Sequence, residues 1–86
     1  MNISTAIRLR VEQLAMERGL SLVELDKMAG LSYNALYHSG EMKNKKYRML
    51  TLLTVYRVCK ALKITMSSFF NEWMFENVDY ERNAGQ

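Results

Sequence analysis

Apolar residues recur every three or four positions near the start of the chain, which is the spacing of one helical face. This spacing predicts a helix over residues 5–18 that begins after Ser4 as its N-cap and ends at Gly19. Its inward face comprises Ile3, Ile7, Val11 and Leu14, and its outer face comprises Arg8, Arg10, Glu12 and Glu17.

Two closely spaced helix starts follow. Ser21 and Glu24 have the S-x-x-E spacing of a capping box, which predicts a helix over residues 22–28 with Leu25 and Met28 facing inward. Gly30 can adopt the left-handed conformation that ends a helix, and Ser32 can cap another helix over residues 33–39. Two short helices joined by a glycine turn predict a helix-turn-helix, whose second helix commonly enters the DNA major groove.

The helical period also separates the two faces of the predicted helix over residues 33–39. Leu36 falls on the core side, and the positions that point outward are Tyr33, Asn34, Tyr37 and His38. A carboxamide can pair bidentately with adenine, and the other three side chains can donate or accept single hydrogen bonds. We therefore expect these four residues to contact DNA bases, while a plain surface role for the two tyrosines stays open.

Basic residues dominate the segment over residues 40–50, which lacks caps and periodicity and is predicted to be a loop. Between Lys43 and Lys63 there are seven basic residues and no acidic one. Such a segment directly after a reading helix is typical of a surface that contacts phosphates, although a merely solvated charged face is the alternative. The candidate phosphate contacts are Ser32, Lys43, Asn44, Lys45, Lys46 and Arg48.

Two further helices are predicted near the C-terminus. Thr51 caps one that runs to about residue 62, with Leu52, Val55, Val58 or Cys59, and Leu62 facing inward. Thr65 caps the other, which runs from Met66 to Trp73 or slightly beyond. The segment after Ser68 is too apolar to lie wholly on the surface of a monomer, so it predicts a homodimer contact, with packing inside the chain as the alternative. The candidate dimer residues are Phe69, Phe70, Trp73, Met74 and Phe75.

Composition narrows the function classes. Up to Phe70 the chain has eleven basic residues against five acidic ones, whereas residues 71–86 have one against four, so we divide it into a domain over residues 1–75 and an acidic tail over residues 76–86. His38 and Cys59 are the single histidine and cysteine, which argues against a zinc site, a disulfide within the chain and an enzyme with a nucleophile and base. We expect no cofactor, and the lack of a signal or membrane-spanning pattern favours the cytoplasm.

The pieces that carry the helix-turn-helix also carry a family resemblance. The segment Gly19 to Ser32, with the pattern G-L-S-x-x-x-L-x-x-x-A-G-L-S, resembles the Cro and phage-repressor helix-turn-helix family, also called the xenobiotic-response-element type. Residues 51–70 are similar to the fourth and fifth helices of that family, so the resemblance covers roughly residues 5–72. It implies an all-α, lambda-repressor-like bundle of five helices that binds a pseudo-palindromic operator in double-stranded DNA as a homodimer and regulates transcription, most often as a repressor.

The sequence departs from the family at two positions. Family members commonly have Gln at the first position of the second helix, where it contacts a phosphate, and this chain has Leu22. Ser39 stands near a position that is usually apolar or aromatic. These departures keep a protein-contact surface open as an interpretation. Leu22 and the two outward tyrosines, Tyr33 and Tyr37, favour an alternative, in which the same fold is a protein-interaction module such as an antirepressor, an antitoxin-like partner or a modulator of another regulator.

Overall fold

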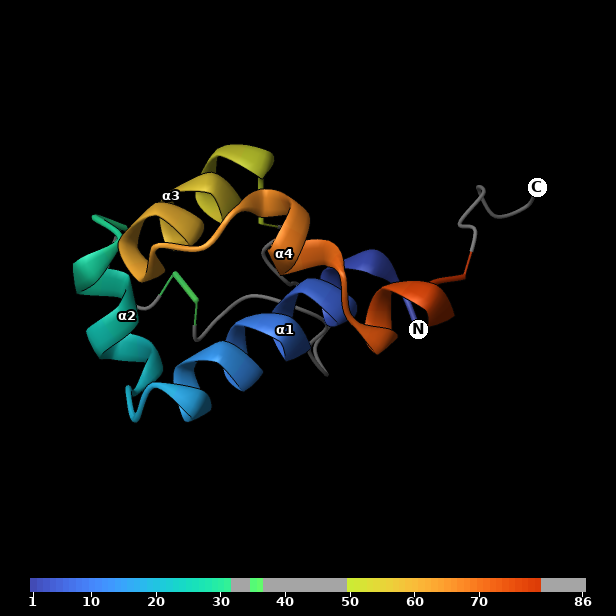
Figure 1. Cartoon of the computed structure of the whole chain (residues 1–86), viewed down its shortest axis with the longest axis horizontal. Helices are drawn as coiled ribbons and strands as arrows, with labels where there is room; N and C mark the ends of the chain where they lie inside the picture. The colour runs from blue at the N-terminus through green and yellow to red at the C-terminus, as the bar shows by residue number, and fades with distance from the viewer. Residues whose placement is uncertain (32–34, 37–49, 80–86) are drawn as a thin grey trace.

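A computed structural model describes residues 1–31, 35–36 and 50–79, and every regular element in these ranges is a helix (Figure 1). The elements are α1 (Ile3–Glu17), α2 (Leu22–Met28), α3 (Leu52–Leu62), α4 (Met66–Phe70) and the 3₁₀ helix η1 (Trp73–Asn77). The all-α prediction is therefore confirmed for the described part of the chain. Most of the predicted helix over residues 33–39 lies outside that part, so the five-helix bundle stays a prediction.

The N-terminal helix begins earlier than the sequence predicts. The side chain of Asn2 accepts a hydrogen bond of 2.8 Å from the backbone N–H of Thr5, so Asn2 is the N-cap of α1. Ser4, the predicted cap, instead lies buried inside the first turn, and Ile3, which is predicted to face inward, is 39% exposed. At the other end the predicted stop at Gly19 is confirmed, because this residue has a φ of +67° and follows the C-cap Arg18.

The core lies between α1, α3 and α4, and α2 closes one end by packing against both α1 and α3 (Figure 1). Val11 from α1, Leu25 from α2, Val58 from α3 and Phe69 from α4 meet there, each of them fully buried. Leu36 is also fully buried in this cluster, as the helical period predicts. Burying an apolar side chain of this size stabilises the fold by about 1.5–3 kcal/mol.

Three residues predicted to face inward are exposed, and Ile3 on α1 is the first of them. On α3 the inward positions Val55, Val58 and Leu62 are confirmed, but Leu52 is 65% exposed. Each helical step turns by about 100°, which places Leu52 beyond the edge of the face that those three residues share. On α2, Met28 is likewise mostly exposed. Leu25 is the one apolar residue of this helix that is fully buried.

The predicted helix from Met66 to Trp73 is two elements in the structure. α4 ends at Phe70, Glu72 is extended with a φ of −143° and a ψ of 159°, and η1 then begins at Trp73. This break returns the chain toward α1 and brings Phe75 against the rings of Phe69 and Phe70, with centroid distances of 6.0 and 4.9 Å. A continuous helix would point these side chains away from one another.

The predicted boundary between residues 75 and 76 falls inside η1, which ends at Asn77. The division into a domain and an acidic tail stays a prediction, because residues 80–86 lie outside the described ranges. Within those ranges, no helix combines the length and the apolar composition that crossing a bilayer requires.

Candidate nucleic-acid interface

The candidate interface is built on α2, whose start is fixed by the predicted capping box. Ser21 Oγ accepts from the backbone N–H of Glu24 at 3.0 Å, and the Glu24 carboxylate accepts from the N–H of Ser21 at 2.8 Å. Both contacts satisfy N–H groups that a helix start leaves open. The prediction that this helix starts at Leu22 is confirmed.

The turn after α2 is the glycine corner that the sequence predicts. Gly30 has a φ of +70°, its N–H donates to Lys27 O at 3.2 Å, and the N–H of Leu31 donates to Asp26 O at 2.9 Å. This pair of bonds is the Schellman motif, in which a left-handed residue ends a helix and reverses the chain. A Cβ atom added at Gly30 would meet nothing within 4 Å, so the backbone angle is what requires glycine here.

Asp26 ties α2 to the residues beyond the turn, and the sequence reasoning missed it. Its side chain is buried, with 3% of the residue exposed, and Oδ1 accepts from the backbone N–H of Leu36 at 3.0 Å. Among the residues that the structure describes, Oδ2 has no hydrogen-bond partner. Burial raises the pKa of this carboxyl, and the bond from Leu36 opposes the shift in part. The one sequence feature that could have indicated this role is the position of Asp26, an acidic residue directly after the inward-facing Leu25.

Arg57 braces the same turn from α3. Its Nη1 donates to Gly30 O at 3.3 Å, at the exposed side of the turn. Asp26 contacts the chain on the buried side, through the N–H of Leu36. A shallow hollow between α2 and α3 adjoins this contact, lined by Met28, Ala29, Gly30, Arg57, Lys60 and Ala61. The glycine corner is therefore fixed by two side chains in addition to its own backbone bonds.

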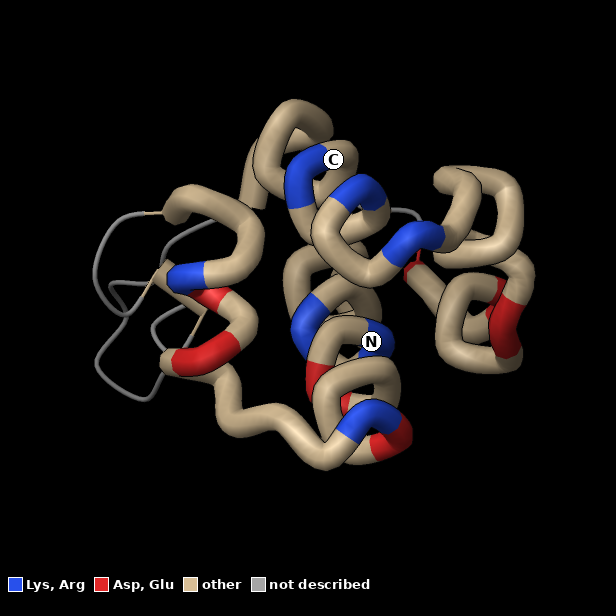
Figure 2. Tube along the Cα trace, turned by 60° about the vertical axis from the view of Figure 1, so that its left-hand side comes forward, with Lys and Arg blue, Asp and Glu red and all other residues tan. Residues whose placement is uncertain are grey.

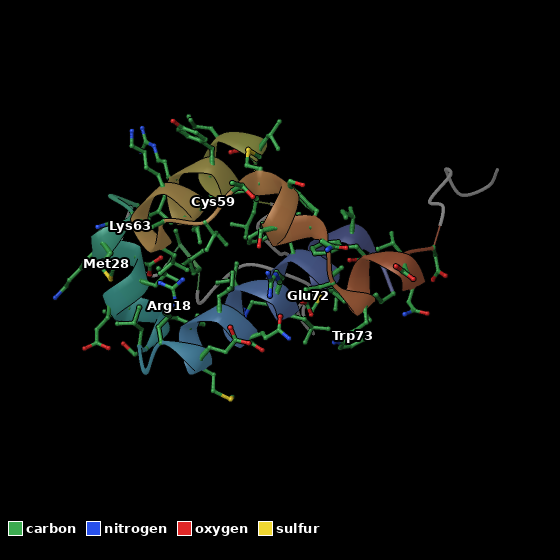
Figure 3. All side chains as sticks on the ribbon, viewed as in Figure 1. Arg18, Met28, Cys59, Lys63, Glu72 and Trp73 are labelled. Carbon is green, nitrogen blue, oxygen red and sulfur yellow. The ribbon has the colours of Figure 1, made fainter. Side chains whose placement is uncertain are left out.

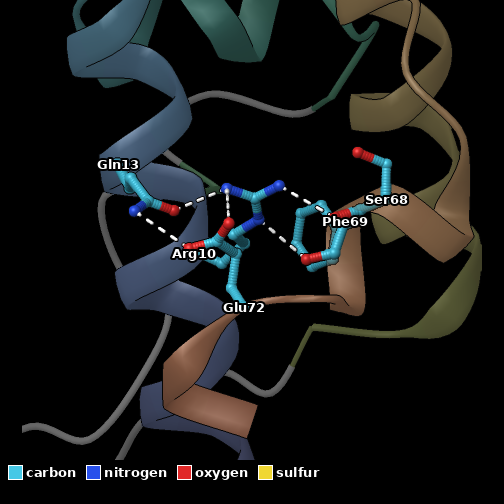
Figure 4. A network of polar contacts seen from close by, with 5 residues as sticks. All are labelled: Arg10, Gln13, Ser68, Phe69 and Glu72. Atoms are coloured by element: carbon cyan, nitrogen blue, oxygen red, sulfur yellow. Dashed lines mark hydrogen bonds and ion pairs between the residues drawn. The ribbon is translucent and has the colours of Figure 1, made fainter.

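A second network, around Arg10, supports the fold behind the candidate interface (Figure 4). Arg10 is predicted to lie on the outer face of its helix, but it is buried. Its Nε donates to Phe69 O at 2.7 Å and its Nη2 to Ser68 O at 2.9 Å, which satisfies carbonyls at the end of α4. Glu72 Oε2 lies 3.9 Å from Nη1, and Gln13 Oε1 accepts from that nitrogen at 2.5 Å. Three hydrogen bonds and one ion pair therefore compensate the burial of this charge.

Cys59 lies on the core side of α3, as predicted (Figure 3). Burial raises the pKa of its thiol, and the positive charge of Arg10 opposes that shift. A buried thiol of this kind is a small apolar side chain and a poor nucleophile.

The residues predicted to contact DNA lie outside the described residues. This holds for the base contacts Tyr33, Asn34, Tyr37 and His38 and for the phosphate contacts Ser32, Lys43, Asn44, Lys45, Lys46 and Arg48. The structure describes what flanks them, namely the glycine corner ending at Leu31 and the buried pair Ala35 and Leu36. Their roles stay predictions.

Charge on the described helices is uneven (Figure 2). α3 carries Arg57 and Lys60 and no acidic residue, whereas α1 and α2 carry both signs. Leu22, at the position where the family has Gln, packs partly against the core. An apolar side chain in that place offers no hydrogen bond to a phosphate.

The candidate dimer residues are divided by the structure. Phe69 and Met74 are fully buried within their own chain, so packing inside the chain, the alternative for this segment, accounts for both of them. Phe70 and Phe75 are half-buried and pack on the core, with ring centroids 4.9 Å apart. Trp73 is mostly exposed and stays the one described member of this set with most of its surface available. The homodimer itself stays a prediction.

Comparisons of the chain with protein-family models, with curated proteins and with solved structures find no match.

Proposed function

We propose that this protein is a sequence-specific double-stranded DNA-binding regulator of transcription, most simply a repressor, built as a five-helix, lambda-repressor-like domain. The observation that carries the proposal is the geometry of α2 and its turn: a capping box at Ser21, a left-handed corner at Gly30 and a buried tie from Asp26 to Leu36. This geometry is what the proposal requires of the first helix and turn of a helix-turn-helix, and the residues that follow the corner have the composition of a reading surface.

In the proposed mechanism the described residues act as the scaffold. α2 and the core hold Leu36, and the neighbouring Asn34 and Tyr37 contact base edges in the major groove. The basic segment from Lys43 to Arg48 contacts phosphates, which fixes register and supplies affinity without reading sequence. A homodimer places two such surfaces about 34 Å apart on successive turns of a pseudo-palindromic operator. Occupying that operator blocks polymerase.

A second function is favoured by a different observation. α3 exposes Leu52, Leu53 and Tyr56, and Leu22 lacks the phosphate contact of the family. Exposed apolar side chains in one place mark a protein contact more often than a DNA contact. A protein-interaction module on the same fold, such as an antirepressor or an antitoxin-like partner, is therefore the competing proposal.

Fluorescence anisotropy with duplexes selected from a randomised pool tests the DNA proposal. We expect selection to enrich one pseudo-palindromic sequence and the affinity for it to depend steeply on salt. If Lys43, Lys45, Lys46 and Arg48 of each copy in the homodimer contact one phosphate apiece, raising the salt concentration fourfold lowers the association constant by about 10⁴-fold. A pool with no enriched sequence and no salt-dependent binding would favour the protein-interaction module.

Variants divide the proposed roles. We expect Asn34→Ala to bind DNA with reduced preference for the selected sequence, and Lys45→Gln to weaken binding to all sequences equally and reduce the salt slope. Arg18→Gln is the matched control, because it removes one exposed positive charge outside the basic segment, at the C-cap of α1. A loss of affinity in Arg18→Gln as large as in Lys45→Gln would show that overall charge, and not the basic segment, drives binding.

A further inference from the structure

A buried carboxylate of α2 contacts the chain beyond the glycine corner. Asp26 directly follows the fully buried Leu25, and only 3% of its own surface is exposed. Its Oδ1 accepts from the backbone N–H of Leu36 at 3.0 Å, although the two residues are ten positions apart in the chain. Leu36 is itself fully buried, so the chain at this residue is held both by its side chain and by its backbone.

These two attachments restrain different motions. The Leu36 side chain, packed in the core, limits how far this part of the chain can move away from α2. An apolar contact has no preferred direction, so by itself it still permits rotation about the local axis of the chain. The hydrogen bond from the Leu36 N–H weakens steeply when its donor and acceptor are misaligned, so it opposes that rotation.

We infer that Asp26 is a positioning residue for sequence recognition: through Leu36 it sets the rotation of the predicted helix over residues 33–39, and thereby the preference among DNA sequences. The inference rests on the proposed function, to which it adds a determinant of specificity that touches no DNA itself. Asp26 acts through the predicted base contacts Asn34 and Tyr37, which lie two positions before and one position after Leu36 in the sequence.

A small rotation is sufficient to change recognition. The outer atoms of a helix lie about 5–6 Å from its axis, so a rotation by about 30° moves them by about 3 Å. Hydrogen bonds to base edges, which need about 2.7–3.2 Å between donor and acceptor, do not survive that displacement. Contacts to phosphates do survive it, because a lysine is a point charge on a flexible stem. Loss of the bond to Leu36 should therefore weaken specific binding and leave non-specific binding nearly unchanged.

A purely structural role fits Asp26 less well. Burying a carboxylate is unfavourable compared with burying an apolar side chain of similar size. Desolvation accordingly raises the pKa of Asp26, and the bond from Leu36 offsets only part of that shift. An apolar residue could fill this place in the core, but it could not accept from the Leu36 N–H. What the carboxylate contributes is therefore a fixed direction of the chain.

The ratio of affinities for the selected sequence and for an unrelated duplex, measured by fluorescence anisotropy with the full chain, tests the inference. We expect Asp26→Ala to lower this ratio at least about tenfold while the affinity for the unrelated duplex changes less than about twofold. Asp26→Asn keeps an acceptor in the same place and should retain the ratio to within about threefold of wild type. The matched control is Thr65→Ala, which also removes a side-chain oxygen that accepts from a backbone N–H, that of Ser68 at 2.9 Å, and should leave both affinities unchanged.

Hydrogen exchange of the backbone amides tests the bond itself without DNA. In Asp26→Ala the Leu36 amide should exchange at least about tenfold faster than in wild type, and in Asp26→Asn it should stay protected. The Leu25 amide, which donates to Ser21 O at 3.0 Å, is the internal reference. Circular dichroism at a temperature well below Tm checks that each variant is folded. Asp26→Leu, which fills the space of the carboxylate, replaces Asp26→Ala if the alanine variant does not fold.

Four results would overturn the inference. An unchanged affinity ratio in Asp26→Ala would show that the bond does not affect recognition, and equal losses for both duplexes would show that Asp26 only supports the fold. Unchanged exchange at Leu36 would show that the bond does not hold the chain. Failure of both Asp26→Ala and Asp26→Leu to fold would assign the residue to stability alone. The proposed function fails by a different result, a wild-type chain for which no DNA sequence is enriched, so the two failures are distinguishable.

Discussion

Replacing Gly30 by alanine isolates the backbone requirement of the turn. A Cβ atom at this position meets nothing within 4 Å, so the substitution adds no clash and acts only through the φ of +70°. Holding an L-residue in the left-handed region costs about 1–2 kcal/mol. The alanine also stiffens the unfolded chain, which returns about 0.4–1 kcal/mol. We therefore expect Gly30→Ala to lower the free energy of unfolding by about 1 kcal/mol.

Two other helix ends provide controls, one expected to lower and one to raise the free energy of unfolding. Gly19 ends α1 with a φ of +67° and equally open surroundings, so Gly19→Ala should cost the same amount far from the turn. Lys63 ends α3 with a φ of 59° and makes the same kind of corner, since the N–H of Ile64 donates to Cys59 O at 3.0 Å. Lys63→Gly should relieve the strain and lose about 0.3 kcal/mol of favourable charge at the helix end, for a net gain of about 0.5 kcal/mol.

Thermal unfolding followed by circular dichroism measures all three changes. In a domain of this size about 1 kcal/mol shifts Tm by about 4–8 °C, so both Gly→Ala variants should unfold that much earlier. DNA affinity well below Tm then separates the two positions, because only Gly30→Ala disturbs the proposed helix-turn-helix. The reasoning is refuted if Lys63→Gly is less stable than wild type, or if Gly30→Ala unfolds at the wild-type temperature.

Three further changes follow from the polar contacts. Arg10→Met should lower the free energy of unfolding, measured in urea, by about 3 kcal/mol, because two carbonyls at the end of α4 lose their donors. Arg18→Met, at an exposed arginine, should stay within about 0.5 kcal/mol of wild type. Equal losses in the two variants would contradict the role of the network. The raised pKa of Asp26 means that the folded state keeps a proton that the unfolded state has lost, so stability falls as pH rises from 3.8 through the raised pKa. Asp26→Asn should flatten that part of the profile in urea titrations, and an unchanged profile would show that Asp26 does not titrate there. Ser21→Ala should cost about 1 kcal/mol by the same measurement, and no loss would mean that water replaces the cap.

Helix starts and stops were the features that the sequence predicted best. Ser21, Thr51 and Thr65 cap the helices that the sequence assigns to them, each by a hydrogen bond to the N–H three residues on. Gly30 ends α2 through bonds to residues within the same helix. These contacts are local, so the order of residues is sufficient to identify them.

Contacts between distant residues account for two of the errors. Arg10 has the spacing of an outer-face residue, yet it is buried because carbonyls 58 and 59 residues later need donors. The same pairing, with Glu72, stops α4 at Phe70 where the apolar pattern continues. Helical periodicity carries no information on which distant element approaches which face.

The candidate site could be predicted only in part. Its support was visible in the capping box and the glycine, but the tie from Asp26 to Leu36 crosses the turn and has no sequence pattern of its own. The proposed base and phosphate contacts rest on the order of residues alone, since Asn34 and Lys45 lie outside the described ranges. The proposed contacts to DNA therefore rest on the sequence, whereas the helix and turn that precede them, α2 and the glycine corner, are described by the structure.

α3 supports the glycine corner on which the proposed function depends. α2 has seven residues, fewer than an isolated helix needs to be stable, so tertiary contacts must hold it in place. One of those contacts joins Arg57 Nη1 to the carbonyl oxygen of Gly30 at 3.3 Å. Arg57→Gln should therefore loosen the turn and lower DNA affinity, whereas Arg18→Gln, which removes an exposed charge at the C-cap of α1, should not. An affinity of Arg57→Gln equal to that of wild type would show that the turn is set without help from α3.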